Sequence, residues 1–205
     1  EMWYVLQADQ DAKLVSGFNR ITNPSEFVES IKTGKLTELL NIEQVTDGDA
    51  FFIPAGRVHT IGKGLLIAEI QQTSDVTYRI YDFDRIGTDG KKRELHIDQS
   101  LEAIDYGQIE NSKVANAVNQ GDTTPLVESN YFVTNKINVS KSFIKSYRDT
   151  IGFKILICVS GAADLHCDHT ITNLKKGEVC LVPALFKEIR IESKEASVFL
   201  ESYTS

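Results

Sequence analysis

The apolar positions of this chain fall mostly into short runs separated by turn residues, a pattern typical of β-strands. In the first half these runs predict strands at residues 2–8, 14–21, 50–53, 65–71 and 76–83, and the polar turn at residues 9–11 predicts a hairpin of the first two. In the second half they predict strands at residues 131–133, 142–147, 153–159 and 198–203. Strands this short and this evenly spaced predict a mainly β, antiparallel protein.

Helical spacing interrupts the strands of the first half. Asn23-Pro24-Ser25-Glu26 places a capping residue directly before a proline, which is typical of a helix start. Apolar residues then recur at helical spacing, so we expect a helical insertion at about residues 24–43. A further short helix is predicted at residues 98–106.

A motif of glycine, proline and histidine surrounds the predicted strand at residues 50–53. Gly48, Pro54, Gly56 and His59 are spaced as glycine, five residues, proline, one residue, glycine, two residues, histidine. The glycines and the proline bend the backbone on either side of the strand, so that His59 enters the next strand and points into the interior. Imidazole is a common metal ligand, and a divalent metal is one interpretation of this position. The alternative is a histidine that only satisfies hydrogen bonds inside a β-barrel.

The same spacing is the second sequence motif of cupin barrels, and part of it recurs later in the chain. The interval from Gly177 to Pro183 equals that from the first glycine to the first proline, so two cupin-like, jelly-roll barrels are expected. Glu188 stands where the histidine stands in the first copy, which predicts that the second barrel has no metal ligand there and is structural. The predicted domains are a metal-site barrel at residues 1–110, a linker at residues 111–125 and a second barrel at residues 126–205.

Composition narrows the classes of function. A chain of 205 residues that is 41% apolar is long enough to bury a core in one large or two small domains. Its net charge of -7 and its mostly dispersed basic residues predict that nucleic acid is not a partner. No apolar run is as long as a bilayer span, and no leader pattern begins the sequence, so a cytoplasmic location without membrane partners is expected. Three cysteines without paired spacing also suit a reducing compartment.

Two further histidine positions are not predicted to bind metal. His166-Cys167-Asp168-His169 lies between strand-like segments, where alternation sends successive side chains to opposite faces, and a hairpin tip fits better than a metal site. His96 has no neighbouring residue of a ligand type, so we expect it to be solvated or locally hydrogen-bonded.

Three segments together resemble class I mannose-6-phosphate isomerase in its shorter bacterial form. They are Glu1-Met2-Trp3-Tyr4-Val5-Leu6, then PAGRVHTIGKG, then LLIAEIQQTSDVTYRIYDFDR, and the similarity extends over essentially the whole chain. The resemblance implies an isomerase that interconverts mannose 6-phosphate and fructose 6-phosphate by metal-assisted proton transfer between C1 and C2, through an enediol. The partner it implies is a small phosphosugar, and it leaves the oligomeric state open.

The resemblance also implies a metal site with one zinc ion. In that family zinc is held by a Gln-x-His segment, by the glutamate of a Lys-x-Glu segment and by the histidine of the proline-glycine turn. Glu1 and His59 match the last two. The other ligands would lie upstream of the given sequence, so we expect these residues to be a portion of a longer isomerase that is inactive by itself.

Catalytic and substrate-binding residues are implied by the same resemblance. Arg79 matches the family's active-site arginine, whose fixed charge suits it to stabilise negative charge on the sugar oxygens. Glu69 and Asp75 match acidic positions of the same segment, and one of them transfers or orients the proton. Arg85 matches a basic position that meets the phosphate. The alternative for Arg85 is a salt bridge to Asp82 or Asp84.

Two other functions remain possible interpretations of the sequence. One is a non-catalytic cupin module that binds a phosphosugar or is structural, and it differs from the enzyme by lacking upstream Gln-x-His and Lys-x-Glu segments. The other is a cupin oxygenase, which usually needs two histidines and a carboxylate around a redox metal, a set that one cupin histidine does not provide.

Overall fold

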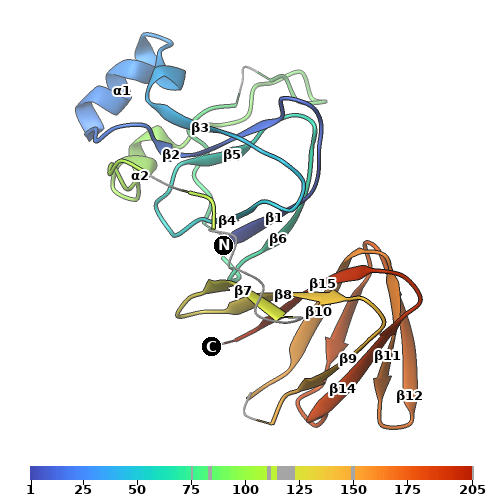
Figure 1. Cartoon of the computed structure of the whole chain (residues 1–205). Helices are drawn as coiled ribbons and strands as arrows, with labels where there is room; N and C mark the ends of the chain where they lie inside the picture. Colours follow the sequence, from blue (N-terminus) through green and yellow to red (C-terminus); the bar gives the residue numbers. More distant parts are fainter. Residues whose placement is uncertain (75, 83–84, 110–111, 115–122, 149–150, 205) are drawn as a thin grey trace. The chain divides into compact units, whose positions relative to one another are not determined.

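The computed structural model describes residues 1–74, 76–82, 85–109, 112–114, 123–148 and 151–204. The chain forms two compact units, Glu1–Lys113 and Val114–Ser205 (Figure 1). Antiparallel strands dominate both units, which confirms the mainly β prediction. The closure of each unit into a barrel stays a prediction. The domain boundaries drawn from the sequence also stay predictions.

The first unit contains two three-stranded antiparallel sheets. One has the order β4-β1-β6 and the other β3-β2-β5, where the strands are β1 (Met2–Ala8), β2 (Lys13–Phe18), β3 (Leu40–Gln44), β4 (Ala50–Phe52), β5 (His59–Ile61) and β6 (Leu65–Ile70). The predicted hairpin of β1 and β2 is wrong, because these strands belong to different sheets. Both bury apolar side chains in one cluster, Trp3 and Val5 from β1 and Leu14 from β2, so the turn between them leads from one sheet to the other.

Helices cover a second apolar cluster in this unit. They are α1 (Pro24–Lys32), the single 3-10 turn η1 (Leu36–Glu38) and α2 (Ile97–Leu101). The Asn23 side chain accepts the Glu26 N–H at 3.0 Å and caps α1, as the sequence predicts. Phe27 of α1 packs against Phe18 of β2, and Leu101 of α2 packs at the margin of the same cluster.

One predicted strand of the first unit is absent. Residues 76–82 have no strand conformation, and the side chains of Val76 and Tyr78 are 61% and 41% exposed. The alternating apolar residues there predicted a strand, but among the described residues no other strand pairs with this segment. An alternating pattern forms a strand only where a partner supplies the hydrogen bonds.

The second unit contains a five-stranded and a four-stranded antiparallel sheet. The orders are β13-β10-β15-β8-β7 and β12-β11-β14-β9. The strands are β7 (Thr123–Glu128), β8 (Val133–Val139), β9 (Ser142–Ser146), β10 (Lys154–Ser160), β11 (Ala162–Cys167), β12 (Thr170–Lys175), β13 (Val179–Val182), β14 (Glu188–Ser193) and β15 (Ser197–Tyr203). Both sheets contribute to one buried cluster that includes Leu156, Leu165 and Phe199. β7 begins inside the segment that the sequence assigned to a linker.

The hairpin predicted at residues 166–169 is confirmed. Cys167 pairs with Thr170 across β11 and β12, and Asp168 takes the positive φ of 49° that the tight turn requires. His166 Nε2 lies 3.1 Å from a carboxylate oxygen of Glu192 on β14.

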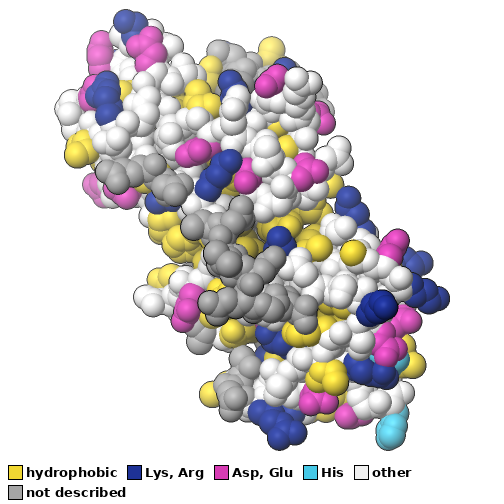
Figure 2. Space-filling model, viewed as in Figure 1, with side chains coloured by type: hydrophobic (Ala, Val, Ile, Leu, Met, Phe, Trp, Pro, Cys, Tyr) yellow, Lys and Arg dark blue, Asp and Glu magenta, His cyan; other side chains and the backbone are white. Residues whose placement is uncertain are grey.

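The surface carries both signs of charge. Figure 2 shows acidic and basic side chains interspersed over the visible face of each unit. In the part of the chain that the structure describes, no helix is long and apolar enough to cross a bilayer. Cys158, Cys167 and Cys180 are free thiols.

Candidate active site

Backbone pairing fixes the position of Glu1. The Glu1 N–H donates to the Ile53 carbonyl at 2.9 Å, and the Ile53 N–H donates back to the Glu1 carbonyl at 2.9 Å, which extends the β1–β4 ladder to the first residue. Because side chains alternate along a strand, Glu1 lies on the same face of the sheet as Trp3, which is 2% exposed.

The glycine-proline motif fixes the position of His59. Gly56 has a φ of +86°, and a Cβ atom there would lie 2.7 Å from the Ala103 carbonyl oxygen, so only glycine allows this turn. The Arg57 N–H closes the turn on the Pro54 carbonyl at 3.3 Å, and the chain then enters β5 at His59. The His59 ring meets the Trp3 ring edge-on, with centroids 5.4 Å apart.

Glu1 and His59 meet directly. His59 Nε2 lies 3.1 Å from Glu1 Oε1, and His59 Nδ1 lies 2.8 Å from the Arg57 carbonyl oxygen. A carbonyl only accepts, so Nδ1 carries the hydrogen, and in a neutral ring Nε2 is then an acceptor that faces a carboxylate oxygen. Two acceptors at this distance need a cation between them or a second proton on the imidazole. Glu1 Oε1 is shielded from solvent, and no other described group donates a hydrogen bond to it.

This pair fits part of a zinc site. Zinc bonds of roughly 2.0–2.2 Å to nitrogen and oxygen place two ligands of a tetrahedral ion about 3.3–3.6 Å apart, and the observed separation of 3.1 Å is slightly shorter. The described residues contain no group of three or more His, Cys, Asp or Glu side chains that could hold a metal. Since catalytic zinc usually has three protein ligands, Glu1 and His59 are a partial set.

Of the two acidic residues predicted for proton transfer, the structure describes Glu69 but not Asp75. Glu69 pairs with Trp3 across β1 and β6, and paired residues project from the same face, so Glu69 shares the face of Trp3 and Glu1. Its side chain is exposed, which places a carboxylate in contact with solvent on that face. Asp75 lies outside the described residues.

Arg79 is held by the segment that leads into α2. Its Nη1 donates to the Glu94 carbonyl at 3.2 Å. Its backbone N–H donates to His96 Nδ1 at 3.1 Å, and its carbonyl accepts the His96 N–H at 2.8 Å. No direct contact joins Arg79 to Glu1 or His59 among the described residues. The sequence left His96 solvated or locally hydrogen-bonded, whereas its imidazole accepts from the Arg79 amide, 17 residues away in the chain.

Arg85 forms a salt bridge to Asp82, which the sequence analysis gave as the alternative to a phosphate contact. The Asp82 carboxylate is 6% exposed and accepts from Arg85 Nη2 at 2.8 Å and from Arg93 Nε at 2.8 Å, with a further contact to Arg93 Nη2. The hydrogen bonds from Arg93 and then Arg85 outweigh burial and lower the pKa of Asp82 from 3.8 to about 2. Sequence reasoning missed Arg93, because it follows two lysines in what reads as a solvated loop.

A hollow of about 300 Å³ adjoins this ion-pair cluster. Its lining includes Leu36 of η1, together with Tyr81, Arg85, Lys92 and Arg93. The hollow therefore brings three basic side chains and one buried carboxylate together in a protein whose net charge is negative.

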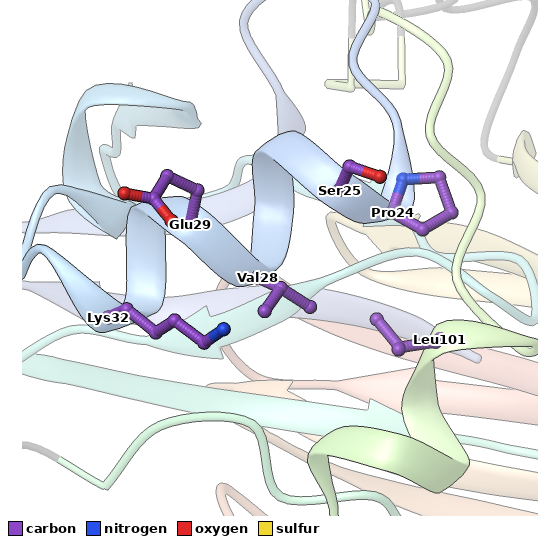
Figure 3. Close-up of a pocket in the computed structure, with 6 residues that line it drawn as sticks. All are labelled: Pro24, Ser25, Val28, Glu29, Lys32 and Leu101. Atoms are coloured by element: carbon purple, nitrogen blue, oxygen red, sulfur yellow. The ribbon is translucent and has the colours of Figure 1, made fainter.

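A second hollow, of about 340 Å³, lies between α1 and α2. Figure 3 shows its lining residues, with Val28 of α1 and Leu101 of α2 facing each other across it. None of the site residues predicted from the sequence lines this hollow, so it does not belong to the candidate active site.

Comparison with known families and curated proteins gives a consistent result. Residues 122–200 match the family described as mannose-6-phosphate isomerase, cupin domain. The mannose-6-phosphate isomerase ManA of Bacillus subtilis is 36% identical over 194 residues, which is 94% of this chain and 61% of that protein. The mannose-6-phosphate isomerase of Streptococcus mutans is 36% identical over 188 residues, which is 91% of this chain and 58% of that protein. The chain thus spans about three fifths of the length of these relatives.

Solved structures agree with these sequence matches. The mannose 6-phosphate isomerase structure from Bacillus subtilis superposes with a TM-score of 0.87 at 26% identity, covering 98% of this chain and 63% of that one. The Salmonella typhimurium enzyme bound to fructose 6-phosphate and zinc has a TM-score of 0.73 at 14% identity, covering 100% of this chain and 66% of that one. At that lower identity the likeness shows the fold alone. The resemblance expected from the sequence is confirmed.

Proposed function

We propose that this chain, a relative of bacterial mannose-6-phosphate isomerases over nearly its whole length, carries part of the active site of such an isomerase. The reaction is the interconversion of mannose 6-phosphate and fructose 6-phosphate. The observation that carries the proposal is the contact of 3.1 Å between Glu1 and His59. It pairs a carboxylate and an imidazole at the two positions that the family resemblance assigns to metal ligands.

Glu1 and His59 would hold zinc together with ligands outside the described residues. When bound, zinc supplies a Lewis acid that stabilises negative charge on the sugar oxygens during proton transfer. The Arg57 carbonyl fixes the orientation of His59 by accepting from Nδ1, which directs Nε2 toward the metal position. Burial of Trp3 beside the imidazole keeps one side of this position free of water.

Proton transfer requires a base and a fixed positive charge. We assign the positive charge to Arg79, whose guanidinium stays protonated through the reaction and stabilises the negative oxygens of the enediolate. We assign proton transfer between C1 and C2, or the orientation of the transferring group, to Glu69 or Asp75. The exposed Glu69 carboxylate, on the same face as Glu1, supports its part in this assignment.

We assign the substrate phosphate to Arg85 and its neighbours. Asp82 restrains Arg85 and Arg93 through shared hydrogen bonds, and Lys92 lines the same hollow. Arginine and lysine side chains form charge-assisted hydrogen bonds with phosphate, so the basic lining of this hollow favours a phosphate dianion. A cytoplasmic location completes the proposal, and the free thiols of Cys158, Cys167 and Cys180 support it.

The proposal is tested in a chimera that joins this chain to the portion of Bacillus subtilis ManA that it does not match. We expect the chimera to bind about one zinc ion and to turn over mannose 6-phosphate. Arg79→Gln is expected to lower kcat by at least a hundredfold with zinc content unchanged, and His59→Gln to lower zinc content. The 205-residue chain alone is expected to show no turnover.

Two outcomes would contradict the isomerase assignment. A folded, zinc-loaded chimera that binds mannose 6-phosphate without turning it over would identify a phosphosugar-binding module instead. Full activity of the Arg79→Gln chimera would show that another group stabilises the enediolate. Circular dichroism and intact mass of each sample establish that the protein compared is folded and complete.

A further inference from the structure

The segment that carries Arg79 has little regular structure to hold it. Residues 76–82 form no strand, and Val76 and Tyr78 are largely exposed. An arginine that stabilises a developing charge must be fixed before the reaction, because reorganisation during the reaction costs free energy. The position of Arg79 therefore depends on the contacts that it makes with other segments.

His96 makes two hydrogen bonds to the backbone of Arg79. The Arg79 N–H donates to the imidazole Nδ1 of His96 at 3.1 Å, and the His96 N–H donates to the Arg79 carbonyl at 2.8 Å. Among the described residues, the imidazole is the acceptor that the structure gives to the Arg79 amide. The two bonds lie on either side of the Arg79 Cα atom, so together they fix where its side chain begins.

His96 is itself attached to a packed element. It precedes α2 (Ile97–Leu101), and its carbonyl accepts the Ser100 N–H at 3.0 Å. Leu101 anchors α2 at the margin of the helix-covered cluster. The bonds from His96 thus connect an irregular segment to a helix with a defined position.

The imidazole must be in one chemical form to make this contact. Nδ1 accepts a hydrogen bond only when it carries no hydrogen, so the ring is neutral with its proton on Nε2. Asparagine places its side-chain oxygen at the same number of bonds from the backbone as Nδ1 and is also an acceptor. Glutamine places its oxygen one bond farther away, where the Nδ1 contact is not reproduced.

We propose that His96 is a positioning residue for Arg79, acting through the bond between its Nδ1 and the Arg79 amide. The role of Arg79 in turnover rests on the proposed function, whereas the contact itself does not. Loss of the acceptor loosens the Arg79 backbone and misplaces the guanidinium when charge develops. The effect therefore falls mainly on kcat, with KM for mannose 6-phosphate changed less.

The first test is NMR of the unaltered 205-residue chain and three variants. In the unaltered chain, the nitrogen-15 shift of His96 Nδ1 is expected to be that of an unprotonated acceptor. Hydrogen exchange of the Arg79 amide is expected to remain slow in His96→Asn. In His96→Gln and His96→Ala it is expected to become about fivefold faster or more, as loss of one hydrogen bond predicts. His166→Asn, in the second unit, is the matched control and should leave this amide unchanged.

The second test is kinetics of the same substitutions in the chimera. We expect His96→Asn to keep most of kcat and His96→Gln to lose about tenfold, with KM within a factor of about two. A protonated Nδ1 in the unaltered chain, or equal exchange of the Arg79 amide in all variants, would overturn the proposal. Faster exchange with unchanged kcat would also overturn it. If the unaltered chimera has no turnover, the proposed function fails, and amide exchange alone decides the positioning role.

Discussion

Asp82 illustrates how single side chains organise the basic part of the site. Its carboxylate is nearly buried, and it accepts hydrogen bonds from both Arg85 and Arg93. The charged form of this carboxylate is favoured, because hydrogen bonds from arginine are stronger to a carboxylate than to a protonated carboxyl group. The low pKa of Asp82 therefore has consequences for stability as well as for phosphate binding.

We predict that Asp82 makes stability depend on acid pH. Its pKa falls from 3.8 to about 2 on folding, mainly through Arg93 and then Arg85. A lowered pKa stabilises the fold fully above about pH 4, and this contribution is lost as the pH falls toward about 2. Asp82→Asn should therefore lower the urea concentration at the unfolding midpoint at pH 6. It should also reduce the change of that midpoint between pH 4 and pH 2. Asp11→Asn, at an exposed turn, is the control, and the same change in both variants would contradict the prediction.

We predict that Gly56 is required by close contact as well as by its φ. Gly56→Ala would place a Cβ atom 2.7 Å from the Ala103 carbonyl, whereas Gly90, with a φ of +77°, has no atom within 4 Å of that position. Gly90→Ala should cost about 1 kcal/mol of unfolding free energy and Gly56→Ala about 2–4 kcal/mol. Denaturant unfolding of the two variants measures the difference. Equal losses would show that the backbone conformation alone matters.

At this scale the sequence predicted some contacts and missed others. The glycine-proline spacing predicted that the chain enters its next strand at His59, and β5 begins there. The His59 side chain was expected to point into the interior, but it is 39% exposed. Family resemblance paired Glu1 with it. The contacts of Arg93 and His96 could not be predicted, because each side chain bonds to a residue distant in sequence, Asp82 in one case and Arg79 in the other. Long-range hydrogen bonds of this kind leave no spacing signal.

At the scale of elements, prediction succeeded where a local pattern determines the structure. α1 formed where Asn23 and Pro24 indicated its start, and β1 occupies the run predicted for it. The β1–β2 hairpin and the strand at residues 76–83 failed because both depend on which strands pair. An alternating pattern shows that a segment has an apolar face, but the partner strand decides whether that face is used.

In the second unit, β15 buries one charged side chain, that of Glu201. Glu201 is fully buried, and its carboxylate accepts from Asn135 at 2.9 Å and lies 3.3 Å from Lys145 on β9. Removing the lysine charge leaves a buried carboxylate with less compensation. We expect Lys145→Met to cost about 2–4 kcal/mol of unfolding free energy, and Lys145→Arg to cost less than about half of that. Chemical denaturation measures both, and a neutral Lys145→Met would show that Asn135 suffices.

At the scale of the whole molecule, each unit has a buried core of its own, and only the first contains the proposed metal ligands. Zinc bound by Glu1 and His59 should therefore stabilise the first unit selectively. At ten times its dissociation constant, a ligand adds about 1.4 kcal/mol to the unit that binds it. Amide exchange with and without zinc should show roughly tenfold slower exchange in globally protected amides of β1 and β4, with β10 and β15 unchanged. His59→Gln should abolish the difference. Equal protection of both units in the unaltered chain would show that they unfold together, so that the metal would stabilise the chain as one cooperative body.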